Sequence, residues 1–449
     1  MAIKAKLTTF DTMMIVVSLV IGIGIFRTPA MVAKATGTPV LFFGAWIVGG
    51  FISLLGALTF AEIGSRFPHP GSFYKVLAES YNSALAFMLN WTNVIIVNGA
   101  GAAAVAIIGA EYLNPILLPP RYQTQIAVQL TAAALIIILL IINFLGIKTG
   151  AWAQNVLTLF KIVMIALLVF AAFKHGGAPA ANAGSGASGS SASWFVALAV
   201  GLISVFYTYG GYQNTINFGA DVRKAQRNMP RAIFAGVAII IACYLSINFA
   251  YVKVLGVHGV AEAKLVAAET AKIVFGEFGY LFVSLAIFLS AMGFLNATLM
   301  QIPRAYYAMA EDRALLPVFK KVNPHTQTQE FTLLFFGAMI LLSIAFLGTF
   351  ENILNYVMFL DSANIAMVAS TIFVLRRKAR QTLEPYDGYK VPLFPVLPAL
   401  FTLFLFGISL NVLLTQTKQA LIGAAFFATG LPVFLLMRRI NKNRERERP

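Results

Sequence analysis

Long apolar runs separated by short polar segments recur along the whole chain. The runs at 131–145 and 233–250 are continuous, unlike the short alternating segments of barrel strands. A helix needs about 20 mostly apolar residues to cross a bilayer, and in lipid only helices and closed barrels satisfy every backbone group. The pattern predicts an all-α integral membrane protein with twelve transmembrane helices, at 11–33, 38–64, 84–110, 126–145, 152–173, 194–220, 230–255, 279–310, 331–349, 353–375, 392–414 and 418–437.

The composition agrees with a membrane protein. Hydrophobic residues make up 59% of the chain and charged residues 11%, whereas soluble domains carry about 25% charged residues. The single cysteine, Cys243, lies in an apolar run, which rules out an intrachain disulfide and is typical of a small buried side chain. The first apolar run continues into a glycine-broken stretch, so no cleavable signal peptide is expected.

The formal net charge of +16 is unevenly distributed. If both termini lie on one side of the membrane, that side holds most of the Lys and Arg residues, and the bias identifies it as cytoplasmic. Basic residues cluster at 223–231 and 376–380, and a basic cytoplasmic tail at 438–449 is expected to lie against anionic lipid. We therefore expect no nucleic acid partner, and we expect a bacterial plasma (inner) membrane protein.

A stretch rich in Gly, Ala and Ser at 176–193 predicts a flexible outside loop. It separates the first ten spans into two sets of five. Because five is odd, the second set starts on the opposite side of the membrane from the first, as an inverted repeat requires. The expected parts are a first five-helix repeat (1–175), this loop, a second inverted repeat (194–376), spans eleven and twelve (377–437) and the tail.

One glycine pair interrupts the first span of each set. Gly22 and Gly24 lie in the middle of the first span, and Gly210 and Gly211 lie at the matching depth of the sixth. Glycine costs about 1 kcal/mol in a helix interior and lets a helix unwind. Either pair alone is typical of close helix packing. Their paired placement favours a transporter binding site.

Several motifs occur in the order and spacing of a known family: GIGIF at 22–26, AEIG at 61–64, PHPGSFY at 68–74, NFLGIK at 143–148, YGGY at 209–212 and RNMP at 227–230. Together they resemble the amino acid–polyamine–organocation (APC) superfamily, most closely its L-type amino acid transporter branch and bacterial relatives. The resemblance implies a LeuT-type fold, a 5+5 inverted repeat plus two helices, with amino acids as substrates. Animal members of the branch are disulfide-linked to a heavy chain. The outside loop at 114–124 has no cysteine, so no such partner is expected.

A free amino acid presents a carboxylate and an ammonium. The outer half of a broken helix offers unpaired amides that suit the carboxylate. We therefore expect the amides of Ile23, Gly24 and Ile25, beside Gly22, to bind it. Unpaired carbonyls suit the ammonium. By resemblance to the family, those carbonyls belong to Val20, Tyr207 and Gly210, and the Tyr207 side chain closes over the substrate.

Lys161 is expected about 14 Å inside the fifth span, too deep to reach the headgroups comfortably. Intramembrane charges are functional candidates by default. We expect its partners to be carbonyls of the broken first span and the hydroxyl of Ser290. In sodium-coupled relatives this corner holds sodium, so the resemblance suggests that the ammonium replaces it. The alternative is a structural tether between helices.

Arg27 follows the first break by three residues, and Asp361 lies some eight residues into the tenth span. Because spans one and ten are neighbours in LeuT-type folds, we predict an outer gate between these two charges. The alternative is that Arg27 reaches the headgroups while Asp361 caps or tethers a helix. We expect Glu62, Asp221 and Arg304 to form solvated ion pairs at the cytoplasmic side.

The sequence has no cluster of residues at metal-ligand spacing and no catalytic or nucleotide-binding motif in a suitable context. We expect no cofactor and no enzyme activity. The predicted function is a neutral L-amino acid permease or exchanger that works by alternating access without sodium. A proton-coupled amine or polyamine carrier would need an acid near the glycine breaks, and none is evident there from the sequence. A channel or receptor is the remaining alternative.

Overall fold

The computed structural model describes residues 5–175, 194–263, 265–276, 278–347, 350–382, 386–415 and 417–446. In these ranges the chain is helical, apart from two isolated β-bridges. The helices are α1 (Thr9–Val20), α2 (Gly24–Thr36), α3 (Pro39–Arg66), α4 (Ser72–Ser80), α5 (Ser83–Thr92), the π-helix η1 (Asn93–Ala100), α6 (Gly101–Leu117), η2 (Pro120–Tyr122), α7 (Gln125–Phe144), α8 (Ile147–Lys174), α9 (Trp194–Tyr209), η4 (Tyr212–Asn217), α10 (Ala225–Glu262), α11 (Val266–Phe275), α12 (Phe278–Glu311), η5 (Pro317–Lys320), α13 (Glu330–Leu347), α14 (Phe350–Thr382), α15 (Val396–Thr415) and α16 (Thr417–Arg446).

The prediction of an all-α membrane protein is confirmed. Among the described residues, nine helices are long and apolar enough to cross a membrane, and a tenth span results if α1 and α2 count as one bent helix. The exact count of twelve spans stays a prediction, because α13 has only a shorter apolar stretch at Glu330–Ala345 and α14 is not among the helices that are long and apolar enough in the described ranges. The predicted outside loop at 176–193 lies outside the described residues.

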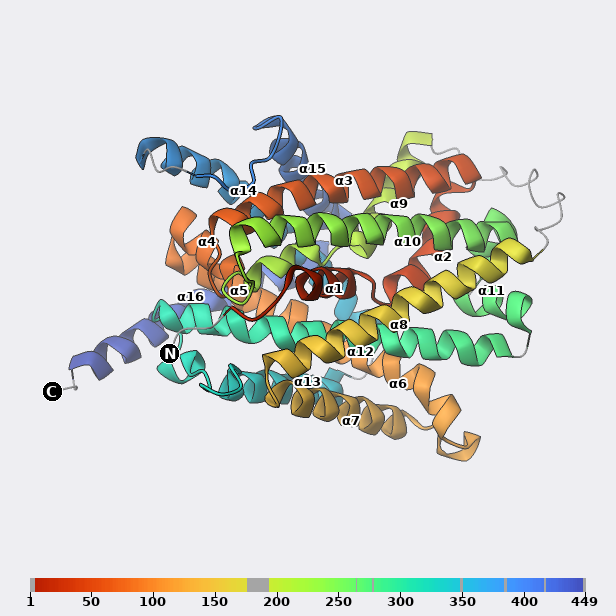
Figure 1. Cartoon of the computed structure of the whole chain (residues 1–449), viewed down its shortest axis with the longest axis horizontal. Coiled ribbons are helices and arrows are strands. Elements are labelled where there is room, and N and C mark those ends of the chain that lie inside the picture. Colours follow the sequence, from red (N-terminus) through yellow and green to blue (C-terminus); the bar gives the residue numbers. More distant parts are fainter. Residues whose placement is uncertain are drawn as a thin grey trace.

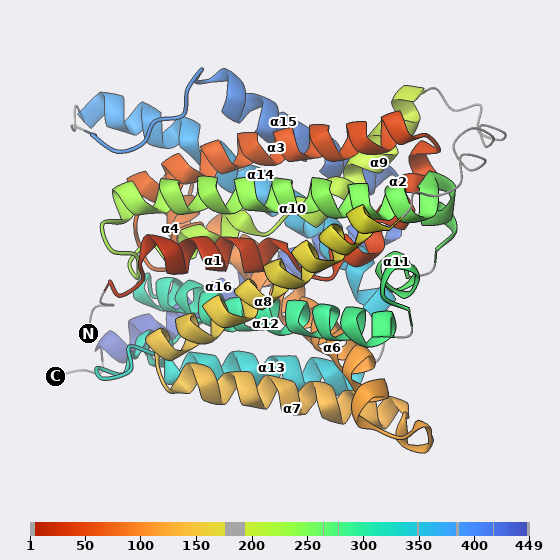
Figure 2. The same ribbon diagram turned by 45° about the vertical axis from the view of Figure 1, so that its right-hand side comes forward.

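The long helices lie side by side, with both chain termini at one end of the molecule (Figures 1 and 2). Helix α9 begins at the opposite end from α1 (Figure 1). Helices from the two halves pack in matching pairs: α2 with α9, α3 with α10, α6 with α12 and α7 with α13. Helix α8 packs on α1 and α12, whereas α14 packs on α6 and η1. This arrangement brings both glycine-broken segments to the middle of the bundle.

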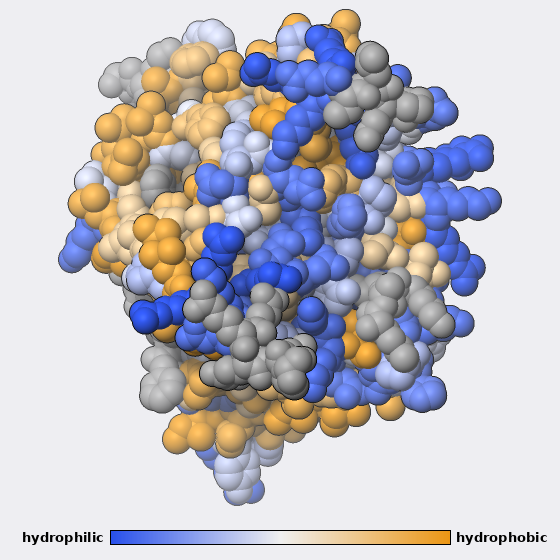
Figure 3. Space-filling model, turned by 90° about the vertical axis from the view of Figure 1, so that its left-hand side faces the viewer, coloured by the Kyte–Doolittle hydropathy of each residue, from blue (hydrophilic) through white to orange (hydrophobic). Residues whose placement is uncertain are grey.

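Side chains on the outer helix faces are apolar and exposed, as lipid contact requires. On α7 they include Ile126, Leu130 and Ile141, and on α8 Trp152 and Phe160. Figure 3 shows the end that carries both termini, where hydrophilic residues form a broad patch. The molecule therefore has an apolar flank and a polar end, as a membrane-embedded protein should.

The ion pairs expected to be solvated are buried instead. The Glu62 carboxylate on α3 is 0% exposed and accepts hydrogen bonds from Arg376 of α14, at 2.6 and 2.8 Å, and from Arg66, at 2.6 Å. Arg304 of α12 donates to Asp221 at 2.8 and 3.1 Å, and both side chains are buried. That prediction was wrong because the packed ends of neighbouring helices, invisible in the sequence, enclose these charges.

Candidate functional site

The first break separates α1 from α2. Helix α1 ends at Val20, Ile21 leaves helical geometry with ψ 84°, and the amide of Gly22 donates to the Val20 carbonyl at 2.7 Å. The axes of the two half-helices differ by 46°. Gly24 and Ile25 lie in the first turn of α2, where an amide has no acceptor within its own helix. Gly22 and Gly24 are partly exposed although they lie mid-bundle.

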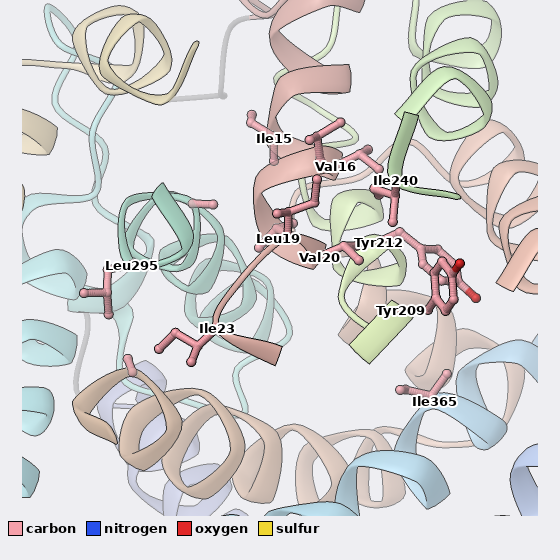
Figure 4. Close-up of a cluster of buried hydrophobic side chains, with 14 of the residues drawn as sticks. Ile15, Val16, Leu19, Val20, Ile23, Tyr209, Tyr212, Ile240, Leu295 and Ile365 are labelled. Atoms are coloured by element: carbon pink, nitrogen blue, oxygen red, sulfur yellow. The ribbon is translucent and has the colours of Figure 1, made fainter. Parts of the chain in front are cut away.

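The second break follows α9. Gly210 and Gly211 interrupt the helix, and the chain continues as the 3-10 helix η4. Gly211 has φ +121°, and a Cβ there would lie 2.2 Å from the carbonyl oxygen of Leu19. Only glycine can satisfy both the backbone angle and this close approach. The second break therefore lies directly against the end of α1, and Leu19, Val20, Tyr209 and Tyr212 share one buried cluster (Figure 4).

Tyr244 of α10 connects the two breaks. Its hydroxyl lies 3.0 Å from the carbonyl oxygen of Val20 and 3.0 Å from that of Thr208. A tyrosine hydroxyl has one proton, so these two carbonyls compete for it. The sequence analysis missed Tyr244 because it lies in a continuous apolar run of α10 and belongs to no local motif. Only the packing of α10 against α1 and α2 shows its role.

Lys161 of α8 reaches the first break. Its side chain is 1% exposed, and its ammonium donates to the carbonyl oxygen of Ile21 and to Ser18 Oγ at 3.2 Å. The expected partner hydroxyl of Ser290 is buried and makes no hydrogen bond within the described part of the chain. The hydroxyl beside the lysine is that of Ser18. Helix α12 approaches closely here, because a Cβ on Gly293 would lie 2.7 Å from Ser18 Oγ and 3.3 Å from Lys161 Nζ.

Two of the three carbonyls expected to bind an amine already have hydrogen bonds. The Tyr207 carbonyl accepts from the amide of Gly210 at 3.3 Å, and the Val20 carbonyl is shared between Gly22 and Tyr244. The Tyr207 side chain is partly buried and shares a hydrogen bond with Ser362 of α14. An incoming ammonium would therefore add to or displace these bonds.

The gate between Arg27 and Asp361 stays a prediction. Arg27 is exposed on α2, and its charge acts on Glu111 of α6. Asp361 instead lies near Tyr207, close enough for its charge to act on the tyrosine hydroxyl. Ile365, one turn further along α14, lies on the Tyr209 side of the buried cluster (Figure 4). The rotation of α14 thus directs Asp361 toward the second break rather than toward α2.

Within the described ranges, no group of three or more His, Cys, Asp or Glu side chains could hold a metal ion. Cys243 lies in α10, partly buried among apolar neighbours. The chemistry at the breaks is therefore that of backbone dipoles, one ammonium, one nearby carboxylate and tyrosine hydroxyls. These groups suit a small zwitterion.

Comparisons with known proteins point in the same direction. A family model described as amino acid permease matches residues 7–435. The serine/threonine exchanger SteT of Bacillus subtilis (strain 168) is 27% identical over 97% of this chain and 98% of its own length. The human b(0,+)-type amino acid transporter 1 is 25% identical over 97% of this chain and 88% of its own. The human large neutral amino acids transporter small subunit 2 is 26% identical over 97% of this chain and 81% of its own.

Proposed function

This chain belongs to the amino acid permease family, and from that premise we propose that it carries neutral L-amino acids across a membrane by alternating access, independently of sodium. One observation carries the proposal: the buried ammonium of Lys161 donates to the Ile21 carbonyl at the first break. A cation is thereby already present where the broken helix exposes carbonyls, and no metal ion is required to satisfy them.

The substrate would lie between the two breaks. Its carboxylate would accept hydrogen bonds from the amides of Ile23, Gly24 and Ile25, at the positive end of α2. Its ammonium would face the carbonyls of Val20, Tyr207 and Gly210. When the single proton of Tyr244 is donated to the Thr208 carbonyl, the Val20 carbonyl accepts only from the Gly22 amide and has a second lone pair for the ammonium.

The architecture we propose is the LeuT-type one, with a 5+5 inverted repeat (1–175 and 194–376) followed by two helices (377–437). Two features support it: corresponding helices of the halves pack in pairs, and the second half begins at the opposite end of the molecule. Both termini and the tail at 438–449 would lie in the cytoplasm of a bacterium. Alternating access would then be a rocking of helices around the breaks.

The proposal is tested in proteoliposomes that hold the purified protein. Uptake of labelled L-serine, L-alanine and L-leucine is measured with and without internal amino acid, and with choline in place of sodium. We expect uptake of at least one of them to survive the removal of sodium and to rise with internal amino acid. Uptake that stops in choline would contradict sodium independence, and uptake indifferent to internal substrate would contradict exchange.

Asp361 favours a second candidate, a carrier of amines or of amino acids with cationic side chains. The sequence suggested no acid near the breaks, but Asp361 lies beside Tyr207. A carboxylate inside a bundle of membrane helices favours a positively charged partner. For this candidate, L-lysine and putrescine would inhibit uptake, and the Asp361→Asn protein would lose that inhibition while neutral uptake remained. No inhibition of either protein would leave only the neutral carrier, and equal inhibition of both would show that Asp361 does not select cations.

A further inference from the structure

Helix α8 carries a buried stripe of three polar side chains and one glycine. The stripe consists of Gly150, Gln154, Thr158 and Lys161, spaced by four, four and three residues, so that all four lie on one helix face. All four are buried, and the stripe extends over about 16 Å at 1.5 Å per residue. It ends at Lys161, the residue that meets the first break.

Asn296 of α12 organises the far end of this stripe. Its side-chain nitrogen donates to Gln154 Oε1 at 2.8 Å and to the Gly150 carbonyl at 3.1 Å. Its side-chain oxygen accepts from Asn143 Nδ2 of α7 at 2.8 Å. One amide that is 0% exposed thus joins α7, α8 and α12 and uses both of its polar atoms.

The hydrogen bonds continue from Gln154 toward α1. Gln154 Nε2 donates to Thr158 Oγ1 at 3.1 Å. The single hydroxyl proton of Thr158 is shared between the Gln154 carbonyl of its own helix, at 2.7 Å, and the Met14 carbonyl of α1, at 3.3 Å. On the adjacent row of α8, Asn155 donates to Asp11 Oδ1 at 2.7 Å. Lys161 then makes the last contacts with α1. Helix α8 is therefore bonded to α1 along most of the length of the half-helix.

These contacts determine how α8 is rotated and how deep it lies. Each residue turns a helix by about 100°, so a slip of one residue would direct Lys161 away from α1. Apolar packing between membrane helices is less directional than hydrogen bonds, and buried amides are costly to leave unpaired. The bonds of Asn296 are thus the ones that hold the rotation of α8 against α12.

We propose that Asn296 is a positioning residue for Lys161: its three side-chain hydrogen bonds orient α8 so that the lysine ammonium reaches the Ile21 carbonyl at the first break. The proposal depends on the function proposed above for Lys161. Asn296 itself does not touch the substrate, so it acts only through the placement of the lysine.

The test is a double-mutant cycle on substrate binding, measured by scintillation proximity with purified full-length protein. The probe is whichever of labelled L-serine, L-alanine and L-leucine the wild type takes up fastest. Asn296→Leu removes the hydrogen bonds at similar volume, and Lys161→Ala removes the ammonium. Thr298→Val is the matched control, since Thr298 is equally buried on α12 but bonds only to Phe294 of its own helix. Size-exclusion profiles verify folding.

We expect Asn296→Leu to weaken binding about tenfold when Lys161 is present and less than about twofold in the Lys161→Ala protein, since residues acting through one contact are not additive. Thr298→Val should bind like the wild type. An equal loss in both backgrounds, or no loss at all, would overturn the proposal. If Asn296→Leu does not fold, Gln154→Leu is measured instead. It removes the side chain to which Asn296 donates, and we expect the same result.

If Lys161→Ala binds nothing measurable, the cycle is repeated with Ser18→Ala, which removes one of the two lysine contacts. If Ser18→Ala and Asn296→Leu together weaken binding by less than the sum of their separate effects on the binding free energy, the proposal is supported. If the two effects add, it is overturned. Failure of the proposed function has a different signature. In that case Lys161→Ala would bind and transport like the wild type, whatever the behaviour of Asn296.

Discussion

At the first break, the ammonium of Lys161 donates to a backbone carbonyl, and the half-helix α1 is hydrogen-bonded to α8 along its length. At the second break, Tyr207 bonds to Ser362 beside an acid, and the chain after η4 is fixed by the buried pair of Asp221 with Arg304. The first break thus receives a basic side chain from α8, and the second has an acidic side chain from α14 nearby. In the function proposed above, Lys161 acts as the resident cation of the first break.

The largest effect is expected from Lys161→Ala, which removes the resident cation. The Ile21 carbonyl and Ser18 lose a charged donor, and such a hydrogen bond contributes about 1.5–3 kcal/mol. Transport should fall about 10- to 100-fold while folded protein stays in the membrane. Initial uptake rates at equal protein content measure this. Near-normal uptake would leave Lys161 only a packing role.

The next effect concerns contact between the breaks. Gly211→Ala places a Cβ within 2.2 Å of the Leu19 carbonyl oxygen, at a φ of +121° that side chains rarely adopt. Strain of this kind costs about 1–3 kcal/mol, so we expect roughly a tenfold loss of transport, or a lower melting temperature. Gly101→Ala is the control, because nothing lies within 4 Å of that position. Equal behaviour of the two variants would show that the breaks do not need to touch.

A smaller effect is expected from Tyr244→Phe, which keeps the ring but removes the hydroxyl shared by Val20 and Thr208. A neutral hydrogen bond contributes about 0.5–1.5 kcal/mol, so KM should change about three- to tenfold. Concentration series of uptake measure KM and Vmax separately. Unchanged values for both would mean that the hydroxyl does not connect the breaks during transport.

The smallest effect distinguishes two serines near the lysine. Ser18→Ala should slow transport a few-fold, because it removes a neutral acceptor of a charged donor. Ser290→Ala should stay within about twofold, because its hydroxyl makes no hydrogen bond in the described part of the chain. The reverse order would make Ser290 the hydroxyl partner of the lysine, as the sequence analysis expected.

The sequence predicted the elements better than their rotations. Apolar runs located the helices, and mid-span glycines located the breaks, because both signals are local. Ser290 was expected where the structure has Ser18, because sequence alone does not specify which face of α12 meets α8. Asp361 was paired with Arg27 without knowledge of how α14 is rotated, which depends on its packing against several helices. Tyr244 and Asn296 contact residues far away in sequence, so the sequence did not show which groups they bind.

The central claim is that the substrate lies at the two breaks without sodium, and site-specific protection tests it directly. The chain has one cysteine, so Cys243→Ala gives a cysteine-free background. Gly22→Cys fits there, because a Cβ at this position meets nothing closer than 3.9 Å. Gly101→Cys is the control. The account predicts that a neutral L-amino acid slows thiol alkylation at position 22 but not at 101, equally in sodium and in choline. Protection absent at position 22, or present only in sodium, would contradict it.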